Sequence, residues 1–252
     1  MLLHPTLDKL KALKLEGMLA ALAEQEALPQ ASALSFEERL GLLVDRELTH
    51  RQNHKLKLRL TRAKLRQEGA LEDLDFRGGR NLDRGQILAL ASCDWLRRHE
   101  NCILTGPTGV GKSFLSCALA NKACREGFDV LYFRVPRLFG ELEQAKADGS
   151  YARKLDTMAR CDLLVLDDWG IAPFTDAQRR DMLEILDDRY RRRSTLVAAQ
   201  VPVEQWHEVI ADPTLADAIL DRLVHNAYKI PMKGESMRKL RGGLTSEPSV
   251  QP

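Results

Sequence analysis

The stretch Gly106-Pro-Thr-Gly-Val-Gly-Lys-Ser113 decides how the rest of the chain is interpreted. It fits the pattern G-x-x-x-x-G-K-[ST], in which glycines let the backbone N–H groups turn inward around an anion. Residues 101–105 before it have the pattern of a short buried strand, and residues 114–125 after it that of a helix. A helix that starts at such a loop directs its positive end toward a phosphate. The stretch therefore predicts a loop that binds a nucleoside triphosphate.

The last residues of this loop carry its chemistry. Lys112 is placed to reach the β- and γ-phosphates, and the Ser113 hydroxyl is placed to ligate Mg²⁺. We therefore expect ATP and Mg²⁺ as cofactors, held by Gly106, Pro107, Thr108, Gly109, Val110, Gly111, Lys112, Ser113 and Phe114. The alternative is a glycine turn that fits the pattern by coincidence, and the strand and helix on its two sides argue against it.

A second signature follows the loop. Asp162-Leu-Leu-Val-Leu-Asp-Asp-Trp169 holds four apolar residues that end in two acids. A buried parallel strand is apolar on both faces, and its carboxyl end lies at the edge of the sheet where ligands bind. Asp167 is then placed to hold Mg²⁺, often through water, and Asp168 to orient or deprotonate the attacking water. The alternative, that one or both acids cap the following turn, stays open and is stronger for Asp168.

The composition is ordinary for a soluble globular protein, with 29% of the 252 residues charged and 44% apolar. This length can hold one large domain, or one domain with a small appendage. No run of 18 apolar residues occurs, and the first residues lack the order of a signal peptide. The five cysteines have no metal-ligand spacing, which indicates reduced core residues. These features predict a cytoplasmic protein without membrane contact.

The net charge of +2 hides an uneven distribution of cations. The segment 46–66 holds eight Lys or Arg residues, and within it only Glu47 opposes them. Arg189-Tyr-Arg-Arg-Arg193 is a second basic run, and a third lies near the end at Lys229, Lys233, Arg238, Lys239 and Arg241. Segment 46–66 has no aromatic residue on which an exposed base could stack. It is therefore expected to contact the phosphates of duplex DNA.

Two kinds of pattern divide the chain. Leucines at helical spacing predict a helix over 6–28, and Ser35-Phe-Glu-Glu38 fits a capping box that opens a second helix, which could reach about residue 67. From about residue 82, short apolar runs alternate with helix-length segments, which is typical of a parallel α/β sheet. We expect a helical N-terminal domain at 1–70, an α/β domain at 71–241 and a disordered tail at 242–252.

The α/β part has five strand candidates and five helix candidates. The expected strands are 102–105, 129–134, 162–167, 195–199 and 228–231, and the expected helices are 113–126, 136–158, 176–192, 203–210 and 215–226.

Here the chain resembles a known family. The phosphate loop, then Leu-Val-Leu-Asp-Asp-Trp-Gly, then Gln200-Val-Pro-Val-Glu-Gln-Trp-His207, look like an IstB-type transposition helper ATPase. Such proteins belong to the AAA+ ATPases, in the clade of the DnaC helicase loaders and DnaA initiators. The resemblance covers nearly the whole chain. It implies a P-loop AAA+ fold with a five-stranded parallel sheet flanked by helices, with the usual helical lid minimal or absent.

The resemblance also implies roles for further residues. Gln200 matches the sensor-1 position, which touches the γ-phosphate and the attacking water, although a polar loop residue is the alternative. Arg222 matches an arginine finger that acts at the nucleotide of a neighbouring subunit, although a surface arginine paired with Asp217 or Asp221 is the alternative. Arg238 sits where the clade has its sensor-2 or late-motif arginine. The region 136–158 matches an extra helix that faces DNA in the clade.

The implied function is ATP hydrolysis by a DNA-binding homo-oligomer that selects target DNA for a transposase. A helicase loader with the same ATPase but a helicase partner is the second possibility. A small-molecule P-loop kinase is a third, and a nucleotide-switched binding protein with negligible turnover is a fourth. The kinase is disfavoured because the chain has an acid pair, a candidate finger and basic segments instead of an arginine-rich lid.

Overall fold

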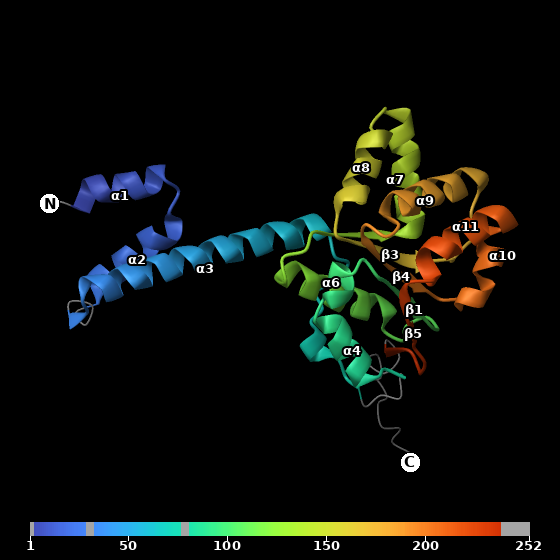
Figure 1. Ribbon diagram of the computed structural model, residues 1–252, viewed down its shortest axis with the longest axis horizontal. Coiled ribbons are helices and arrows are strands. Elements are labelled where there is room, and N and C mark those ends of the chain that lie inside the picture. The colour runs from blue at the N-terminus through green and yellow to red at the C-terminus, as the bar shows by residue number, and fades with distance from the viewer. Residues whose placement is uncertain (1–2, 29–32, 77–80, 238–252) are drawn as a thin grey trace, which may run out of the picture. The chain divides into compact units, whose positions relative to one another are not determined.

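The computed structural model describes residues 3–28, 33–76 and 81–237 (Figure 1). Its contacts divide the chain into two compact units, Met1–Leu58 and Arg59–Pro252. We call them the N-terminal unit and the α/β core. The division falls inside helix α3 (Phe36–Ala63). The domain limits at 70 and 241 expected from the sequence stay predictions, and the tail at 242–252 lies outside the described residues.

The N-terminal unit consists of helices. The single helix expected over 6–28 is two helices, α1 (Leu3–Ala12) and α2 (Glu16–Ala27), and the break holds Lys14 at a φ of 56°. The predicted capping box at the start of α3 is confirmed. Glu38 N–H donates to Ser35 Oγ at 3.2 Å, and Ser35 N–H donates to a Glu38 carboxylate oxygen at 2.8 Å. Both bonds satisfy N–H groups that a helix start leaves without partners.

Glu47, the one acid of the basic segment, joins α3 to α2. Its Oε2 accepts the backbone N–H groups of Gly17 at 2.8 Å and Met18 at 3.2 Å. A carboxylate at these first N–H groups also meets the positive end of α2. The helices approach so closely that a Cβ at Gly17 would lie 2.6 Å from Glu47 Cα. The carboxylate therefore serves as the start cap of another helix.

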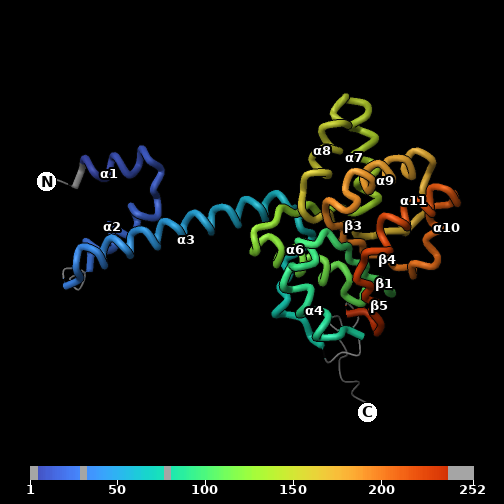
Figure 2. The backbone as a smooth tube through the Cα atoms, viewed as in Figure 1, coloured from blue at the N-terminus to red at the C-terminus, as the bar shows by residue number. Residues whose placement is uncertain are grey.

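Five parallel strands form the sheet of the α/β core, as predicted (Figure 2). They are β1 (Asn101–Thr105), β2 (Val130–Arg134), β3 (Leu163–Trp169), β4 (Ser194–Ala199) and β5 (Ala227–Pro231), in the order β2-β3-β4-β1-β5. Each expected strand is present within two residues of its predicted ends. The central strands are buried along nearly their whole length, which explains their uninterrupted apolar sequence.

Helices cover both faces of this sheet (Figure 1). On one face, Leu164, Leu166 and Val197 belong to a core cluster that includes residues of α7 (Val135–Ala147), α9 (Asp176–Arg189) and α11 (Pro213–Val224). On the other face, α6 (Lys112–Arg125) contacts β1, β2, β3 and β4. Because strand side chains alternate between faces, Tyr132, Arg134 and Asp167 belong to the face that carries α6.

Several helices differ from their predicted limits. The helix expected over 136–158 is wrong as a single element, because α7 ends at Ala147 and α8 (Tyr151–Arg160) begins after a turn with Gly149 at a φ of +76°. The helix expected over 203–210 is a 3-10 turn, Val203–Gln205, followed by α10 (Trp206–Ile210). The sequence interpretation also missed α4 (Arg84–Ala91) and α5 (Asp94–Arg97), which are too short for a clear period.

The cysteines and the lengths of the helices can be compared with the expectations drawn from the composition. All five cysteines are unpaired and buried, as predicted. Burial raises the pKa of the Cys102 thiol to about 12 and that of Cys93 to about 11. No helix in the part of the chain that the structure describes is long and apolar enough to cross a bilayer.

Candidate functional site

The phosphate loop lies between the end of β1 and the start of α6. Gly106 and Gly109 have φ values of +144° and +85°, which side-chain-bearing residues rarely adopt. A Cβ at Gly106 would lie 2.2 Å from the carbonyl oxygen of Met232, and one at Gly109 would lie 2.1 Å from Ser236 Oγ. The segment after β5 therefore packs so closely on the loop that only glycine fits at these two positions.

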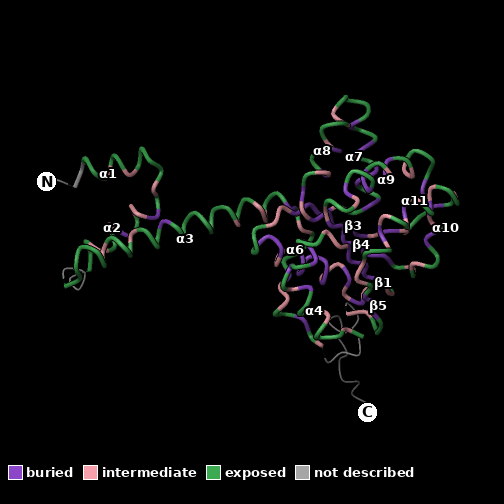
Figure 3. The backbone as a smooth tube through the Cα atoms, viewed as in Figure 1, coloured by how far each residue is buried: buried purple, intermediate pink, exposed green. Residues whose placement is uncertain are grey.

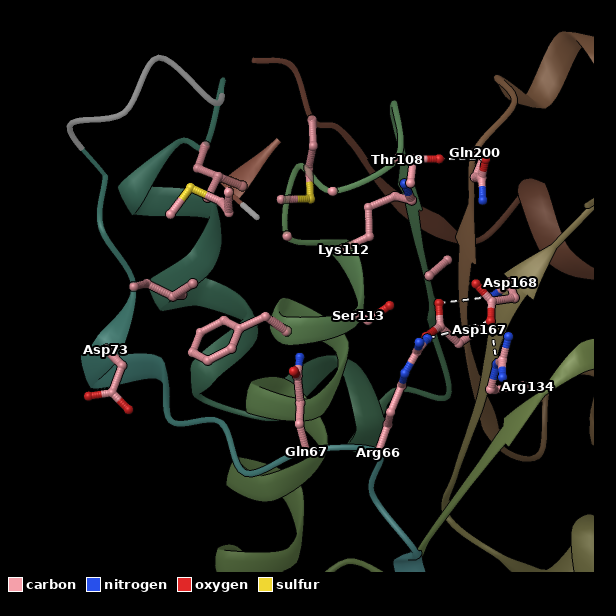
Figure 4. Close-up of a pocket in the computed structure, with 18 of the residues that line it drawn as sticks. Arg66, Gln67, Asp73, Thr108, Lys112, Ser113, Arg134, Asp167, Asp168 and Gln200 are labelled. Carbon is pink, nitrogen blue, oxygen red and sulfur yellow. Dashed lines mark hydrogen bonds and ion pairs between the residues drawn. The ribbon is translucent and has the colours of Figure 1, made fainter. Parts of the chain in front are cut away.

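The side chains of the loop point into one pocket (Figure 4). Lys112 Nζ donates to the carbonyl oxygens of Gly106 at 2.6 Å and Pro107 at 2.9 Å. Burial lowers the pKa of this amine, and the negative charges of Asp167 and Asp168 oppose the change. The Ser113 hydroxyl points toward the acid pair. One ammonium and one hydroxyl thus meet two carboxylates at the carboxyl edge of the sheet.

The two acids reach the same site because β3 is irregular at its end. In a regular strand, Asp167 and Asp168 would point to opposite faces. Here the register of β3 against β4 shifts between Leu166 and Trp169, and Asp168 has a φ of +59°. Such a bulge re-aims a side chain. Both carboxylates consequently lie near one guanidinium, with Arg66 Nη1 3.6 Å from Asp167 Oδ2 and 3.5 Å from Asp168 Oδ2.

Other partners hold the acid pair in place. The Tyr132 hydroxyl donates to Asp167 Oδ2, Asp168 N–H donates to Asp167 Oδ1 at 2.9 Å, and Arg134 Nε donates to Asp168 Oδ2 at 2.5 Å. Asp167 is 1% exposed. Among the hydrogen bonds of the described residues, neither carboxylate accepts an N–H group from the turn that follows β3. The alternative in which the acids cap that turn therefore has no support in these bonds.

Sequence reasoning missed Arg66 and Tyr132 as parts of this site. Tyr132 stands at an inward position of β2, where a hydroxyl among apolar residues was the available signal. Arg66 was counted among the cations expected to contact DNA, and its position along the chain does not reveal that it reaches β3. Burial raises the pKa of the Tyr132 hydroxyl, and the neighbouring Asp167 raises it further. Tyr132 therefore remains a proton donor to the carboxylate.

The pocket has a volume of about 440 Å³. One wall is the phosphate loop with the start of α6, and the acid pair forms another. The remaining walls come from the segment before α4, with Gln67, Asp73 and Leu74, and from Met232 and Met237 after β5. A cavity of this size fits a nucleotide-sized ligand, with apolar walls away from the charged loop.

The other candidate residues, which the family resemblance implied, do not all line this pocket. Gln200 lines the pocket, and its side-chain oxygen accepts a hydrogen bond from the Thr108 hydroxyl at 2.8 Å. Arg222 does not line it. Arg222 Nε donates to Asp187 Oδ1 at 2.6 Å, so its partner is neither Asp217 nor Asp221. Arg238 lies outside the described residues.

Several cations in or beside the regions expected to contact DNA also have partners within the protein. Arg134 pairs with Asp168, Lys146 with Asp181, and Lys154 with Glu141. Arg59 and Arg62 lie 3.9 and 3.8 Å from Asp129 carboxylate oxygens. Arg189 is 1% exposed and donates to the carbonyl oxygens of Met158, Cys161 and Ser194. Arg189 therefore stabilises the core instead of forming part of a basic surface.

The residues at this edge fit Mg²⁺ and a triphosphate. Ser113, at the start of α6, and Asp167, at the end of β3, supply hard oxygen donors. Within the described ranges, no group of three or more His, Cys, Asp or Glu side chains could hold a metal ion. Mg²⁺ suits this donor set because it usually takes only one or two carboxylates and completes its shell with phosphates and water.

The fold and the site together define a P-loop protein. A solved structure of DnaI has a TM-score of 0.53 and 24% identity, and the match covers 66% of this chain and 92% of that chain. AMPPCP-bound DnaA from Aquifex aeolicus has a TM-score of 0.56 and 18% identity, with 73% of this chain and 58% of that chain covered. These likenesses concern the fold, and they confirm the predicted class.

The chain belongs to the family of IstB-like ATP binding proteins, which it matches over residues 8–243. An insertion sequence ATP-binding protein of Sinorhizobium fredii is 52% identical over 239 residues, which are 95% of this chain and 98% of that protein. The IS21 ATP-binding protein of Pseudomonas aeruginosa is 33% identical over 236 residues, covering 94% of this chain and 88% of that protein. The family resemblance inferred from the motifs is confirmed.

Proposed function

We propose that this protein is an ATP-hydrolysing, DNA-binding helper of transposition that acts as a homo-oligomer. The observation that carries the proposal is the meeting of the phosphate loop with Asp167 and Asp168 at one sheet edge, in a chain whose relatives are named after insertion sequences. The relatives' names favour transposition over helicase loading, because the DnaC structure shares 20% identity and hence supports only the fold.

The proposed reaction is attack of water on the γ-phosphorus, with cleavage of the bond to the β–γ bridging oxygen and release of ADP and phosphate. Lys112 exchanges its two carbonyl partners for the β- and γ-phosphate oxygens. Asp168 orients the water and accepts its proton, while Gln200 holds the water or the γ-phosphate from the other side. Mg²⁺ on Ser113 and Asp167 would neutralise charge that develops on the phosphate oxygens.

Assembly is part of the proposal because Arg222 does not line the pocket of its own chain and pairs instead with Asp187. In the proposed oligomer, Arg222 reaches the nucleotide of the neighbouring subunit and stabilises the transition state. To do so, it leaves Asp187, its partner within the chain. Duplex DNA is the proposed polyanion ligand, and a transposase the proposed protein partner.

Steady-state ATP hydrolysis with and without duplex DNA tests the proposal. We expect the parent to turn over ATP and Lys112→Ala to lose nucleotide binding, because the substitution removes the cation that reaches the β- and γ-oxygens. Lys122→Ala is the matched control, since Lys122 lies on the same helix and pairs with Glu126 outside the pocket. Nucleotide affinity of Lys112→Ala within about threefold of the parent would contradict the assignment.

A pull-down with candidate transposases then distinguishes the helper from a helicase loader. A protein that binds ATP without turnover, in the presence and absence of DNA, is instead a nucleotide-switched binding protein.

A further inference from the structure

A segment of the α/β core ahead of the sheet, residues 59–75, lies along α6, and we call it the strap. Ala63 is 0% exposed, and Arg59 and Arg62 lie beside Asp129 at the start of β2. A Cβ at Gly69 would lie 3.3 Å from the carbonyl oxygen of Phe114 and 3.4 Å from the N atom of Ala118. The strap therefore follows the helix whose start is the phosphate loop.

The middle of the strap carries Arg66 to the acid pair. Burial raises the pKa of the Cys117 thiol on α6, and hydrogen bonds from the backbone N–H groups of Gln67 and Arg66 oppose the rise. The backbone of the strap is thus in direct contact with α6, while the Arg66 guanidinium extends between the Oδ2 atoms of Asp167 and Asp168. Figure 4 shows this guanidinium beside Asp167, where the Ser113 hydroxyl also points.

Arg66 is the most loosely held of the groups on the acid pair. Arg134 donates to Asp168 at 2.5 Å from the end of β2, and Tyr132 donates to Asp167 from inside the same strand. Arg66 approaches the two acids at 3.5 and 3.6 Å, which is beyond ordinary hydrogen-bond length, and its guanidinium also interacts with the Tyr132 hydroxyl. Its contact with the acids is therefore electrostatic. Because Arg66 comes from the strap and not from a strand, it can leave the acids without moving the sheet.

Mg²⁺ and the Arg66 guanidinium require the same space. Mg²⁺ needs oxygen ligands at about 2.0–2.1 Å in near-octahedral geometry and keeps several waters. Its two protein donors here, Ser113 and Asp167, face the place where the guanidinium lies. A positive group beside the ligand oxygen also repels the divalent cation. The acid pair can accordingly hold one of the two cations closely, but not both.

We propose that Arg66 is a built-in countercation of Asp167 and Asp168, which Mg²⁺ with bound nucleotide displaces, so that the strap senses occupancy of the site. The inference rests on the proposed function, because it requires that the pocket bind a nucleotide with Mg²⁺. Displacement removes one of the contacts that hold the strap on the rest of the core, the one between Arg66 and the acids of β3. The end of α3 is the first part of the strap, so it is thereby coupled to nucleotide binding.

The test measures binding of a non-hydrolysable ATP analogue as Mg²⁺ is titrated, so that turnover plays no part. Arg66→Gln removes the competing charge and is expected to lower the Mg²⁺ concentration for half-maximal binding. Coupling in proteins is typically roughly 5- to 150-fold, so we expect a shift of at least about fivefold. Arg66→Lys keeps a charge and should restore most of the parental Mg²⁺ requirement. Arg62→Gln is the matched control, with the same charge change on the same strap but a contact to Asp129.

Hydrogen exchange of the backbone amides of residues 64–70 gives a second readout. In the parent, the analogue with Mg²⁺ should speed exchange in this segment, whereas the analogue with a chelator should not. In Arg66→Gln the segment should exchange quickly under both conditions. A thermal melt of each variant shows that the core is folded.

Two results would overturn the proposal. One is an Arg66→Gln variant that needs as much Mg²⁺ as the parent or more, which would make Arg66 a partner of the bound metal complex instead of its competitor. The other is strap exchange that does not respond to Mg²⁺ and analogue. A further control shows whether the proposed function itself has failed. If the parent binds the analogue in chelator and Lys112→Ala does not, the pocket binds nucleotide, and either result counts against the role of Arg66 alone.

Discussion

The α/β core and the N-terminal unit differ in how they use apolar side chains. In the core, β3 and β4 are buried almost throughout, and helices close over both faces of the sheet (Figure 3). In the described part of Met1–Leu58, the buried residues are Gly17, Ala21 and Glu47. Large apolar side chains stand exposed there, at Leu13, Leu28, Leu34, Phe36, Leu40, Leu42, Val44, Leu48 and Leu58.

This difference teaches that helical periodicity and a packed core are separate properties. Phe36, Leu40, Val44 and Leu48 recur every four residues along α3 and remain exposed. Burial of apolar surface provides most of the stabilisation that fixes side chains within fractions of an ångström. Chemistry that needs such fixed positions belongs in the core. The N-terminal unit suits contacts that tolerate imprecise geometry, such as contacts to phosphates.

The largest expected effect in the core is the loss of Arg222. Arginine fingers are worth roughly 10³- to 10⁵-fold in rate, so Arg222→Ala should be nearly inactive. Mixing it with inactive Lys112→Ala should restore some ATPase activity, because one variant supplies an intact loop and the other an intact finger. Arg160→Ala, which removes an exposed arginine paired with Asp156, is the control. Absence of recovery at every ratio, with assembly confirmed by size, would argue against a shared site.

The second effect separates the two acids. General-base catalysis contributes about 10²- to 10⁴-fold, so Asp168→Asn should lose that much turnover while it keeps nucleotide binding. Asparagine tolerates the left-handed conformation that residue 168 adopts, so the bulge should persist. Asp167→Asn should in addition weaken Mg²⁺-dependent binding. Single-turnover rates and equilibrium binding of both variants provide the comparison, and parental turnover in Asp168→Asn would remove its assigned role.

The third effect lies in the N-terminal unit and should leave the core unchanged. Arg46, Arg51 and Lys55 are exposed on α3, and the acids that pair with Arg46 and Arg51, Glu24 and Glu47, belong to the same unit. If each contacts a phosphate, their replacement by Ala should reduce the slope of log K against log salt by roughly 3, at about 0.9 per contact. Binding to every duplex should weaken alike, while ATP affinity stays parental.

The exposed triple variant Lys9→Ala, Lys11→Ala and Lys14→Ala is the matched control, with the same charge change on or just after α1. Unchanged duplex affinity in the α3 variant would move the DNA site to α7 and α8 or to residues 190–193. Arg59, Arg62 and Arg66 are unsuitable for this test because each lies beside an acid of the core.

The sequence predicted the sheet and the phosphate loop well because their signals are local. Uninterrupted apolar runs are required by strands buried on both faces, and Gly106 and Gly109 are required by close approach of the segment after β5. The break at Gly149 did have a local signal that the prediction passed over. Asp148-Gly149-Ser150 are poor helix formers, and Asp-Gly is typical of turns.

The surroundings of the acid pair could not be predicted in the same way. The bulge that turns Asp168 toward Asp167 depends on the register of β3 against β4, and no neighbouring residue signals it. Arg66 and Arg189 have the composition of surface cations, yet one lies beside the acids and the other is buried under carbonyl oxygens. Charge along the sequence indicates cations but not their partners, which are set by tertiary contacts.

The smallest expected effect is the loss of a helix cap, which can be compared between equivalent caps in the two regions. Ser35 caps α3 in the N-terminal unit, and Thr175 caps α9 in the core, where its hydroxyl accepts the N–H group of Gln178 at 3.4 Å. Loss of such a cap costs about 1 kcal/mol in either place. Thr175→Ala should lower the main melting transition by roughly 2–4 °C, as expected for a domain of this size.

Ser35→Ala should leave that main transition in place, because the N-terminal unit has almost no buried apolar core to share with the sheet. It should instead lower the temperature at which helical circular dichroism is first lost, ahead of the main transition. The loss of the cap is a larger share of the small free energy of unfolding of the N-terminal unit. Ser35→Thr and Thr175→Ser keep the hydroxyl and serve as controls. If Ser35→Ala shifts the main transition as far as Thr175→Ala does, the two units unfold together, and the contrast in packing does not translate into independent stability.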